Sequence, residues 1–143
     1  MSIPAILLPV FVQVALTFAL LLWTGSRRLH ALRGQEVRPP DVALSQKAWP
    51  APAQQAANAF GNQFELPVLF YVLVVLAIFA RKADLLFVVL SWIFVATRFV
   101  HAGIYLTTNY IPHRFGAFLA GAVVLMIMWI VFAVRILAGP WPA

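Results

Sequence analysis

Polar and ionisable side chains interrupt two long apolar segments of the chain, and these residues are the ones best suited to chemistry. The first segment contains Asn62 and Glu65, and the second contains Arg98, His101 and Tyr105. A carboxylate inside a membrane is costly, so it requires a partner. We therefore predict an ion pair between Glu65 and Arg98. It has two candidate roles, a structural lock between helices or the ordering of a ligand-binding slot, and the sequence leaves both open.

The spacing of these residues predicts that they meet at one depth. If the two segments run antiparallel, a rise of about 1.5 Å per residue places Glu65 about 16 Å and Arg98 about 15 Å from the same membrane face. Asn62 and His101 match in the same way, at about 12 and 10 Å. The three polar residues of the second segment share one face about 60° wide. With Arg114, which begins the next apolar segment, they predict a polar slot open to the cytosol or the inner leaflet.

Each of these side chains also has a simpler interpretation when it is taken alone. His101 would serve as a hydrogen-bonded packing residue, Tyr105 as interfacial aromatic packing, and Arg114 as an arginine that snorkels to the membrane edge. Their convergence at one depth is what favours a functional site. Glu65 and His101 lack the local spacing of metal ligands and no third ligand accompanies them, so we predict no metal site.

The composition predicts an all-α integral membrane protein with a single domain, residues 1–143. Hydrophobic residues make up 64% of the chain and charged residues only 10%, against about 25% in soluble domains. Four apolar stretches are long enough to cross a membrane, and they lie at about 4–24, 54–80, 85–108 and 114–137. The net charge of +6 comes from residues that flank these spans, so we predict no nucleic-acid partner. The absence of cysteine excludes disulfides and thiolate nucleophiles from the chain itself.

The distribution of basic residues predicts the orientation. The loop at 27–53 contains five Lys or Arg residues, whereas the turn after the second span contains two. By the positive-inside rule the first loop is cytoplasmic and both termini are periplasmic. No basic residue precedes the first span, so we interpret it as a retained helix that continues to about Arg33 rather than a signal peptide. Trp49 and Trp141 are predicted to anchor the chain at the membrane interface.

Two further patterns predict local helix geometry. Pro67 lies inside the second span, where a proline removes one backbone hydrogen bond and clashes with the carbonyl four residues earlier. We therefore expect a kink or a loosened turn at 63–67. The fourth span contains small residues four apart, Gly116 with Ala120 and Ala117 with Gly121, which permit close helix contact.

Two motifs of the chain resemble the signatures of the MAPEG family (membrane-associated proteins in eicosanoid and glutathione metabolism). They are Asn62-x-x-Glu65 followed by Pro67, and Arg98-x-x-His101-x-x-x-Tyr105 followed by Arg114. The size, the four spans and the long basic first loop match as well, so the resemblance covers essentially the whole chain. Its pattern is that of a bacterial branch of the family, which implies the bacterial inner membrane.

The resemblance implies a homotrimer of four-helix subunits with glutathione as cofactor, held between subunits at the cytoplasmic side. It assigns Asn62, Glu65, His101, Tyr105 and Arg28 to glutathione binding. It places Arg114, as the catalytic residue, near the sulfur, where a cation favours the nucleophilic thiolate. The second substrate would be a lipophilic small molecule, an electrophile or a hydroperoxide, that arrives through the lipid bilayer. The implied activity is that of a glutathione-dependent transferase or peroxidase.

Two other functions stay open. The first is a non-catalytic lipid-binding or partner-binding membrane protein of the same fold that has lost glutathione binding. The second is a small proton-coupled transporter that uses Glu65 and His101 as a relay. We rank the transporter last, because the outer half of the predicted bundle offers no ionisable residue to continue the path.

Overall fold

Four long apolar helices dominate the computed structural model, which describes residues 1–139. The four segments long and apolar enough to cross a membrane are Ile3–Arg33, Ala51–Phe79, Leu85–Leu106 and Ile111–Leu137. The first is α1, the third α5 and the fourth α6, while the second divides into α3 (Ala51–Gly61), η2 (Asn62–Phe64) and α4 (Leu66–Phe79). Two short elements, α2 (Pro39–Val42) and η1 (Gln46–Ala48), lie in the first loop. The predicted interfacial Trp141 lies outside the described residues.

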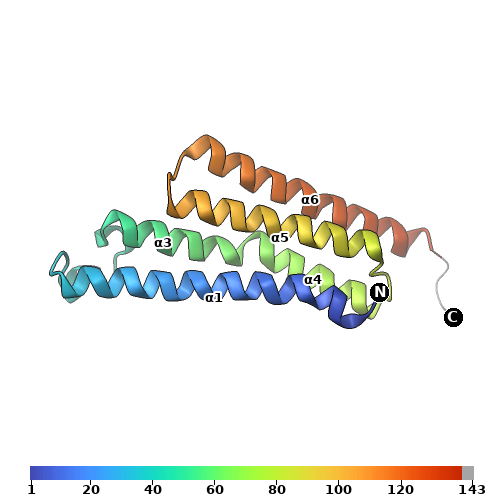
Figure 1. The fold of residues 1–143 in the computed structure, drawn as a ribbon, viewed down its shortest axis with the longest axis horizontal. Coiled ribbons are helices and arrows are strands. Elements are labelled where there is room, and N and C mark those ends of the chain that lie inside the picture. Colours follow the sequence, from blue (N-terminus) through green and yellow to red (C-terminus); the bar gives the residue numbers. More distant parts are fainter. Residues whose placement is uncertain (140–143) are drawn as a thin grey trace.

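The helices run alternately up and down, and the connections lie at two ends of the bundle (Figure 1). We name these ends by their residues. The turn end contains the turn at 80–84 together with the start of α1 and the end of α6, and the loop end contains segment 34–50 and the turn at 107–110. Helix α6 packs on α5 and α4 at the opposite side of the bundle from α1. Its outward face is apolar and exposed, as expected of a surface that contacts lipid.

The first helix confirms the predicted continuation past the first span, because α1 ends at Arg33. The irregular part of the predicted loop at 27–53 is therefore limited to residues 34–50. Trp49 differs from our prediction: it is buried between Ala31 and Ala53, with the guanidinium of Arg28 5.1 Å from its ring centre. The tryptophan thus fastens the loop to α1 and α3, because its ring finds more apolar surface there than at an exposed position.

The second span breaks where Pro67 predicts a loosened turn. A short 3-10 helix occupies Asn62–Phe64, and Glu65 then takes φ −98° and ψ −105° before α4 begins. Pro67 lies in the first turn of α4, where its missing N–H costs no helical hydrogen bond. The break changes the rotation of the chain, so that Gln63 points into the bundle and Glu65 points out of it.

Close contact between α5 and α6 depends on one of the two predicted small-residue pairs. Gly121 is buried against α5, where an added Cβ would lie 2.7 Å from Oγ1 of Thr97. A Cβ added at Gly116 would have no neighbour within 4 Å, and both Gly116 and Ala120 are exposed. Close approach is therefore confirmed at Gly121, and Gly116 faces outward.

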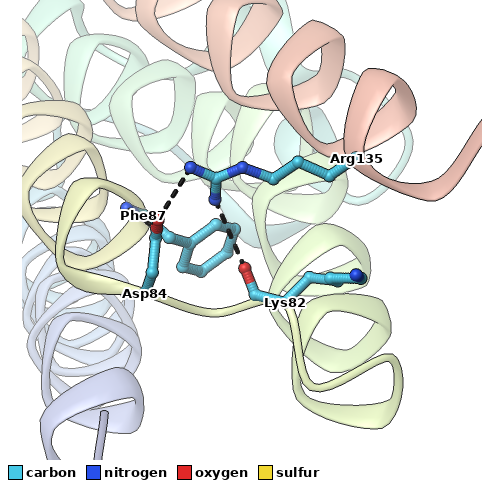
Figure 2. A network of polar contacts seen from close by, with 4 residues as sticks. All are labelled: Lys82, Asp84, Phe87 and Arg135. Atoms are coloured by element: carbon cyan, nitrogen blue, oxygen red, sulfur yellow. Dashed lines mark hydrogen bonds and ion pairs between the residues drawn. The ribbon is translucent and has the colours of Figure 1, made fainter. Parts of the chain in front are cut away.

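The two ends of the bundle are packed differently. Toward the turn end, large apolar side chains from all four long helices form one buried cluster. Asp84 caps α5 there by accepting a hydrogen bond from the Phe87 N–H at 3.0 Å, and it also pairs with Arg135 (Figure 2). Toward the loop end the apolar clusters are smaller. The buried polar residues Arg98 and His101 lie between these regions, on α5.

Candidate functional site

The innermost contact of the candidate site joins Arg98 to His101 on α5. Both side chains are buried, with 0% and 3% of their surface exposed. Nη2 of Arg98 lies 3.2 Å from Nδ1 of His101. A guanidinium has only N–H donors, so the imidazole nitrogen that meets it must be the acceptor. His101 is therefore neutral with its proton on Nε2, and Nε2–H is available as a donor on the far side of the ring.

Four of the predicted site residues line one cavity of about 230 Å³. Asn62 reaches it from η2, His101 and Tyr105 from α5, and Arg114 from α6. Three apolar side chains of α6 complete the lining, namely Ile111, Phe115 and Phe118. The rings of His101 and Tyr105 meet edge to face with centres 5.8 Å apart. The structure thus assembles the slot from the three elements that the sequence pattern indicated.

Arg114 is held in this cavity by two contacts. Its Nη1 donates to Oδ1 of Asn109 at 2.6 Å, and its guanidinium lies 4.3 Å from the ring centre of Tyr105. Asn109 has φ 48°, a left-handed conformation that asparagine tolerates better than most residues. One residue therefore both forms the turn between α5 and α6 and orients the arginine. Asn109 was not among the predicted site residues, although an asparagine in a short link between two spans is the signal that would have pointed to it.

Glu65 does not form the predicted ion pair with Arg98 in the single chain. Within residues 1–139 the ion pairs are Arg38–Asp41 at 3.0 Å and Arg135–Asp84 at 2.7 Å. Arg98 is buried, whereas Glu65 is exposed. The physical reason is the break at η2: matching depth was computed for a continuous helix, and the 3-10 turn rotates Glu65 away from α5.

Arg98 consequently has hydrogen-bonding capacity left over. Its Nε and Nη1 are buried and have no partner within the described part of the chain. The ring of Phe118 lies 5.8 Å from the guanidinium and provides a cation–π contact. Buried N–H groups without a partner are costly. The site is therefore rich in donors and poor in acceptors, which suits an anionic ligand.

A buried pair of amide side chains, Gln13 and Gln63, supports the site from the α1 side. It was not among the sequence predictions. Nε2 of Gln13, on α1, donates to Oε1 of Gln63 at 2.8 Å, and Nε2 of Gln63 donates to the Ala59 carbonyl at 3.1 Å. This pair fixes η2 against α1 and so fixes the position of Asn62. Gln13 is the one amide side chain inside the first span, which is the signal that would have pointed to it.

Arg28 lies in a different cavity, of about 490 Å³, between α1, η1 and α3. Lys47, Asn58 and Phe60 also line it. Nη2 of Arg28 donates to Oε1 of Gln46 at 2.5 Å, and its Nε is buried without a partner among the described residues. The single chain therefore separates Arg28 from the other predicted glutathione ligands, although both cavities lie toward the loop end.

The donor set is unsuited to a metal ion. Across residues 1–139 there is no group of three or more His, Cys, Asp or Glu side chains placed to hold one. The cavity instead presents the Arg114 guanidinium and the His101 Nε2–H, with Asn62 as a neutral amide. Such groups bind carboxylates and stabilise a thiolate.

The chain matches a protein-family model but no individual curated protein or solved structure. Neither curated proteins nor solved structures give a significant match to this chain. The family model of the MAPEG family matches residues 6–134, which include most of α1 and α6, all of the helices between them and every residue of the candidate site. The chain is therefore an integral membrane protein that belongs to the MAPEG family.

Proposed function

We propose that this protein is a glutathione-dependent transferase or peroxidase that acts on lipophilic substrates. The observation that carries the proposal is the placement of Arg114 in the same cavity as His101, held by Asn109 and Tyr105. A fixed cation close to a thiol lowers its pKa and so favours the nucleophilic thiolate. Glutathione, when bound, supplies that thiolate.

The chemistry of the cavity matches the parts of this substrate. Arg114 is the catalytic residue and stabilises the thiolate, while the Nε2–H of His101 is a second donor aimed away from Arg98. Asn62 and Tyr105 supply further polar groups at the same wall. Ile111, Phe115 and Phe118 provide the apolar surface that a lipophilic electrophile or hydroperoxide would contact. Because Ile111 and Phe115 are exposed, such a substrate can reach the cavity from the bilayer.

The size of the cavity supports a homotrimer with the site between subunits. About 230 Å³ in one chain is below the roughly 300–1,000 Å³ of typical ligand pockets. A tripeptide therefore needs a second surface, and the cavity at Arg28 and Lys47 offers two cations for its carboxylates. In this proposal Arg28 of one subunit completes the site of its neighbour, Glu65 faces the same interface, and the loop end is cytoplasmic in a bacterial inner membrane.

A thermal-shift measurement tests glutathione binding. Millimolar glutathione is expected to raise the melting temperature of the detergent-solubilised protein, because a ligand that binds only the folded state stabilises it. Arg114→Ala should abolish the shift. Arg33→Ala is the matched control, because it removes an exposed arginine at the same end outside both cavities. The absence of a shift in the wild-type protein would end the proposal.

Two isosteric variants test the role of the histidine. A glutamine at position 101 carries an amide N–H near the position of Nε2, whereas an asparagine reaches only the position of Nδ1. His101→Gln is therefore expected to retain glutathione binding and His101→Asn to weaken it. Equal losses would show that the Nε2–H donor is not used.

A non-catalytic member of the same fold, which binds a lipid or a protein partner, is the second candidate. The observation that favours it is the neutral character of Asn58, Phe60 and Gly61, which flank Asn62 without adding a cation for the glutathione carboxylates. The thermal-shift series separates the two candidates, because a lipid-binding member would respond to lipid and not to glutathione.

A further inference from the structure

A cationic cavity at the turn end, far from the candidate site, has no role in the proposed function. It has a volume of about 480 Å³. Three basic side chains line it, Arg81, Lys82 and Arg135, against one carboxylate, that of Asp84. Met1 and Ala83 complete the lining. The excess of positive charge indicates an anionic ligand.

The charges of this cavity are not equivalent (Figure 2). Arg135 is committed to the protein, because its Nη2 pairs with Oδ2 of Asp84 at 2.7 Å and its Nη1 lies 3.5 Å from the Lys82 carbonyl. The ammonium of Lys82 points away from both of these groups in Figure 2. Neither Lys82 nor Arg81 takes part in an ion pair within residues 1–139. These two side chains therefore keep their full charge for a ligand.

Local backbone geometry keeps Arg81 at the mouth of the cavity. Arg81 has φ 53°, in the left-handed region that normally favours glycine at the end of a helix. The turn is closed by two hydrogen bonds, from the Arg81 N–H to the Ile78 carbonyl and from the Lys82 N–H to the Ala77 carbonyl. The two cations, which form no ion pair within residues 1–139, are thus adjacent in a hydrogen-bonded turn.

The surroundings of the cavity are apolar. A narrow crevice between α5 and α6 shares Lys82 and Arg135 with the cavity, but its volume of about 10 Å³ is too small for an acyl chain. The remaining lining of this crevice is hydrophobic, with Leu86, Phe87, Leu90, Met128, Val131 and Phe132. Leu85 and Leu137, beside the mouth, are exposed large hydrophobic residues. A ligand that uses both the cationic cavity and these exposed leucines has an anionic head at the membrane edge and a hydrocarbon tail against the outer apolar surface.

We propose that the turn end binds an anionic phospholipid, with the phosphate-bearing headgroup at Arg81 and Lys82 and an acyl chain against the exposed apolar surface at Leu85 and Leu137. Basic side chains at the membrane edge attract anionic lipid headgroups. The pairing of Arg135 with Asp84 supports the site by holding α6 against the start of α5. This inference does not depend on glutathione binding, since the two sites lie at opposite ends of the bundle.

Native mass spectrometry of the detergent-solubilised protein tests this site with three probes. Phosphatidylglycerol should bind, phosphatidylcholine with the same acyl chains should bind much more weakly, and inorganic phosphate alone should not compete at equal concentration. Arg81→Gln with Lys82→Gln should reduce phosphatidylglycerol binding about tenfold or more, because each basic residue near an anionic lipid contributes a factor of about five. The control, Arg27→Gln with Arg33→Gln, removes two arginines near the loop end and should leave the affinity unchanged.

Three results would overturn the proposal. Equal binding of the two lipids would show that charge is not recognised. Displacement of the lipid by equimolar phosphate would show a site for a soluble anion. An equal loss in the control variant would show diffuse attraction between a basic protein and an anionic lipid. Both double variants keep the Asp84–Arg135 pair, and a melting temperature measured without added lipid confirms that each is folded.

Discussion

The two halves of the bundle differ in what the same four helices bury, apolar side chains in one half and polar side chains in the other. Toward the turn end, the rings of Phe70 and Phe94 pack at a tilt with centres 4.8 Å apart inside a buried apolar cluster, and the Asp84–Arg135 pair lies at the surface. Toward the loop end, the same helices enclose polar groups whose N–H donors are only partly satisfied. The apolar packing that stabilises the fold and the proposed glutathione site therefore lie in different halves of the bundle. Substitutions in the packed half should lower stability and leave ligand binding intact.

The largest effect is expected from Phe70→Ala in the packed half. Removing a buried phenylalanine typically costs about 3–5 kcal/mol of unfolding free energy, because lost contacts add to the cavity left behind. Denaturation with SDS in mixed micelles measures this loss. The glutathione-induced thermal shift should persist in the variant. Phe79→Ala, at an exposed position on the same helix, is the control and should change stability by less than about 0.5 kcal/mol.

The buried arginine of the polar half should behave in the opposite way. Arg98→Met replaces two unpartnered buried N–H groups by an apolar chain of similar length. Replacing buried charges by apolar residues often stabilises a protein, by about 1–4 kcal/mol. We expect higher stability together with weaker glutathione binding, since His101 loses the contact that fixes its tautomer. ¹⁵N NMR of labelled histidine would then show both tautomers. A loss of stability would indicate that Arg98 has a partner in the assembled protein.

Gly121→Ala tests the close approach of α5 and α6, which joins the two halves of the bundle. The added methyl group would lie 2.7 Å from Oγ1 of Thr97, which is itself held by a hydrogen bond to the Phe94 carbonyl at 2.6 Å. Overpacking of this kind costs about 1–3 kcal/mol. Gly116→Ala on the same helix meets nothing within 4 Å, so it should be neutral or slightly stabilising. Equal losses in SDS denaturation would contradict the specific role of Gly121.

The smallest effect is expected at the charged pair that closes the packed half. The hydrogen bond from Arg135 holds the pKa of Asp84 below its ordinary value of 3.8. The pair therefore contributes its full stability above that ordinary pKa and loses it as the pH falls through the lower pKa of the folded state. Asp84→Asn keeps a capping oxygen but removes the charge, so it should cost less than about 1 kcal/mol at neutral pH. The cost should vanish in strong acid, and a pH-independent cost would contradict the pairing.

Much of the fold could be predicted from the sequence because it depends on local chemistry. Apolar stretches of the right length predicted the four long helices, and Pro67 predicted the break in the second span. The residues that meet in the cavity were predicted because depth follows directly from the rise per residue. The predicted Glu65–Arg98 ion pair is absent from the single chain, because the 3-10 turn that Pro67 helps to create changes the rotation of the residues around it and turns Glu65 outward. Trp49 was misplaced because its burial depends on Ala31 and Ala53, which are distant in sequence.

The sequence by itself determined that this chain spans the membrane, where its helices begin and break, and which polar residues share a depth. These properties follow from hydrophobicity and helix geometry, which act over a few residues. Only the tertiary structure decided that Arg98 meets His101 and leaves Glu65 outside, that Asn109 holds Arg114, and that Gln13 fixes Gln63. Such contacts depend on the relative rotation of whole helices, which is set by packing such as that at Gly121 and not by any local pattern.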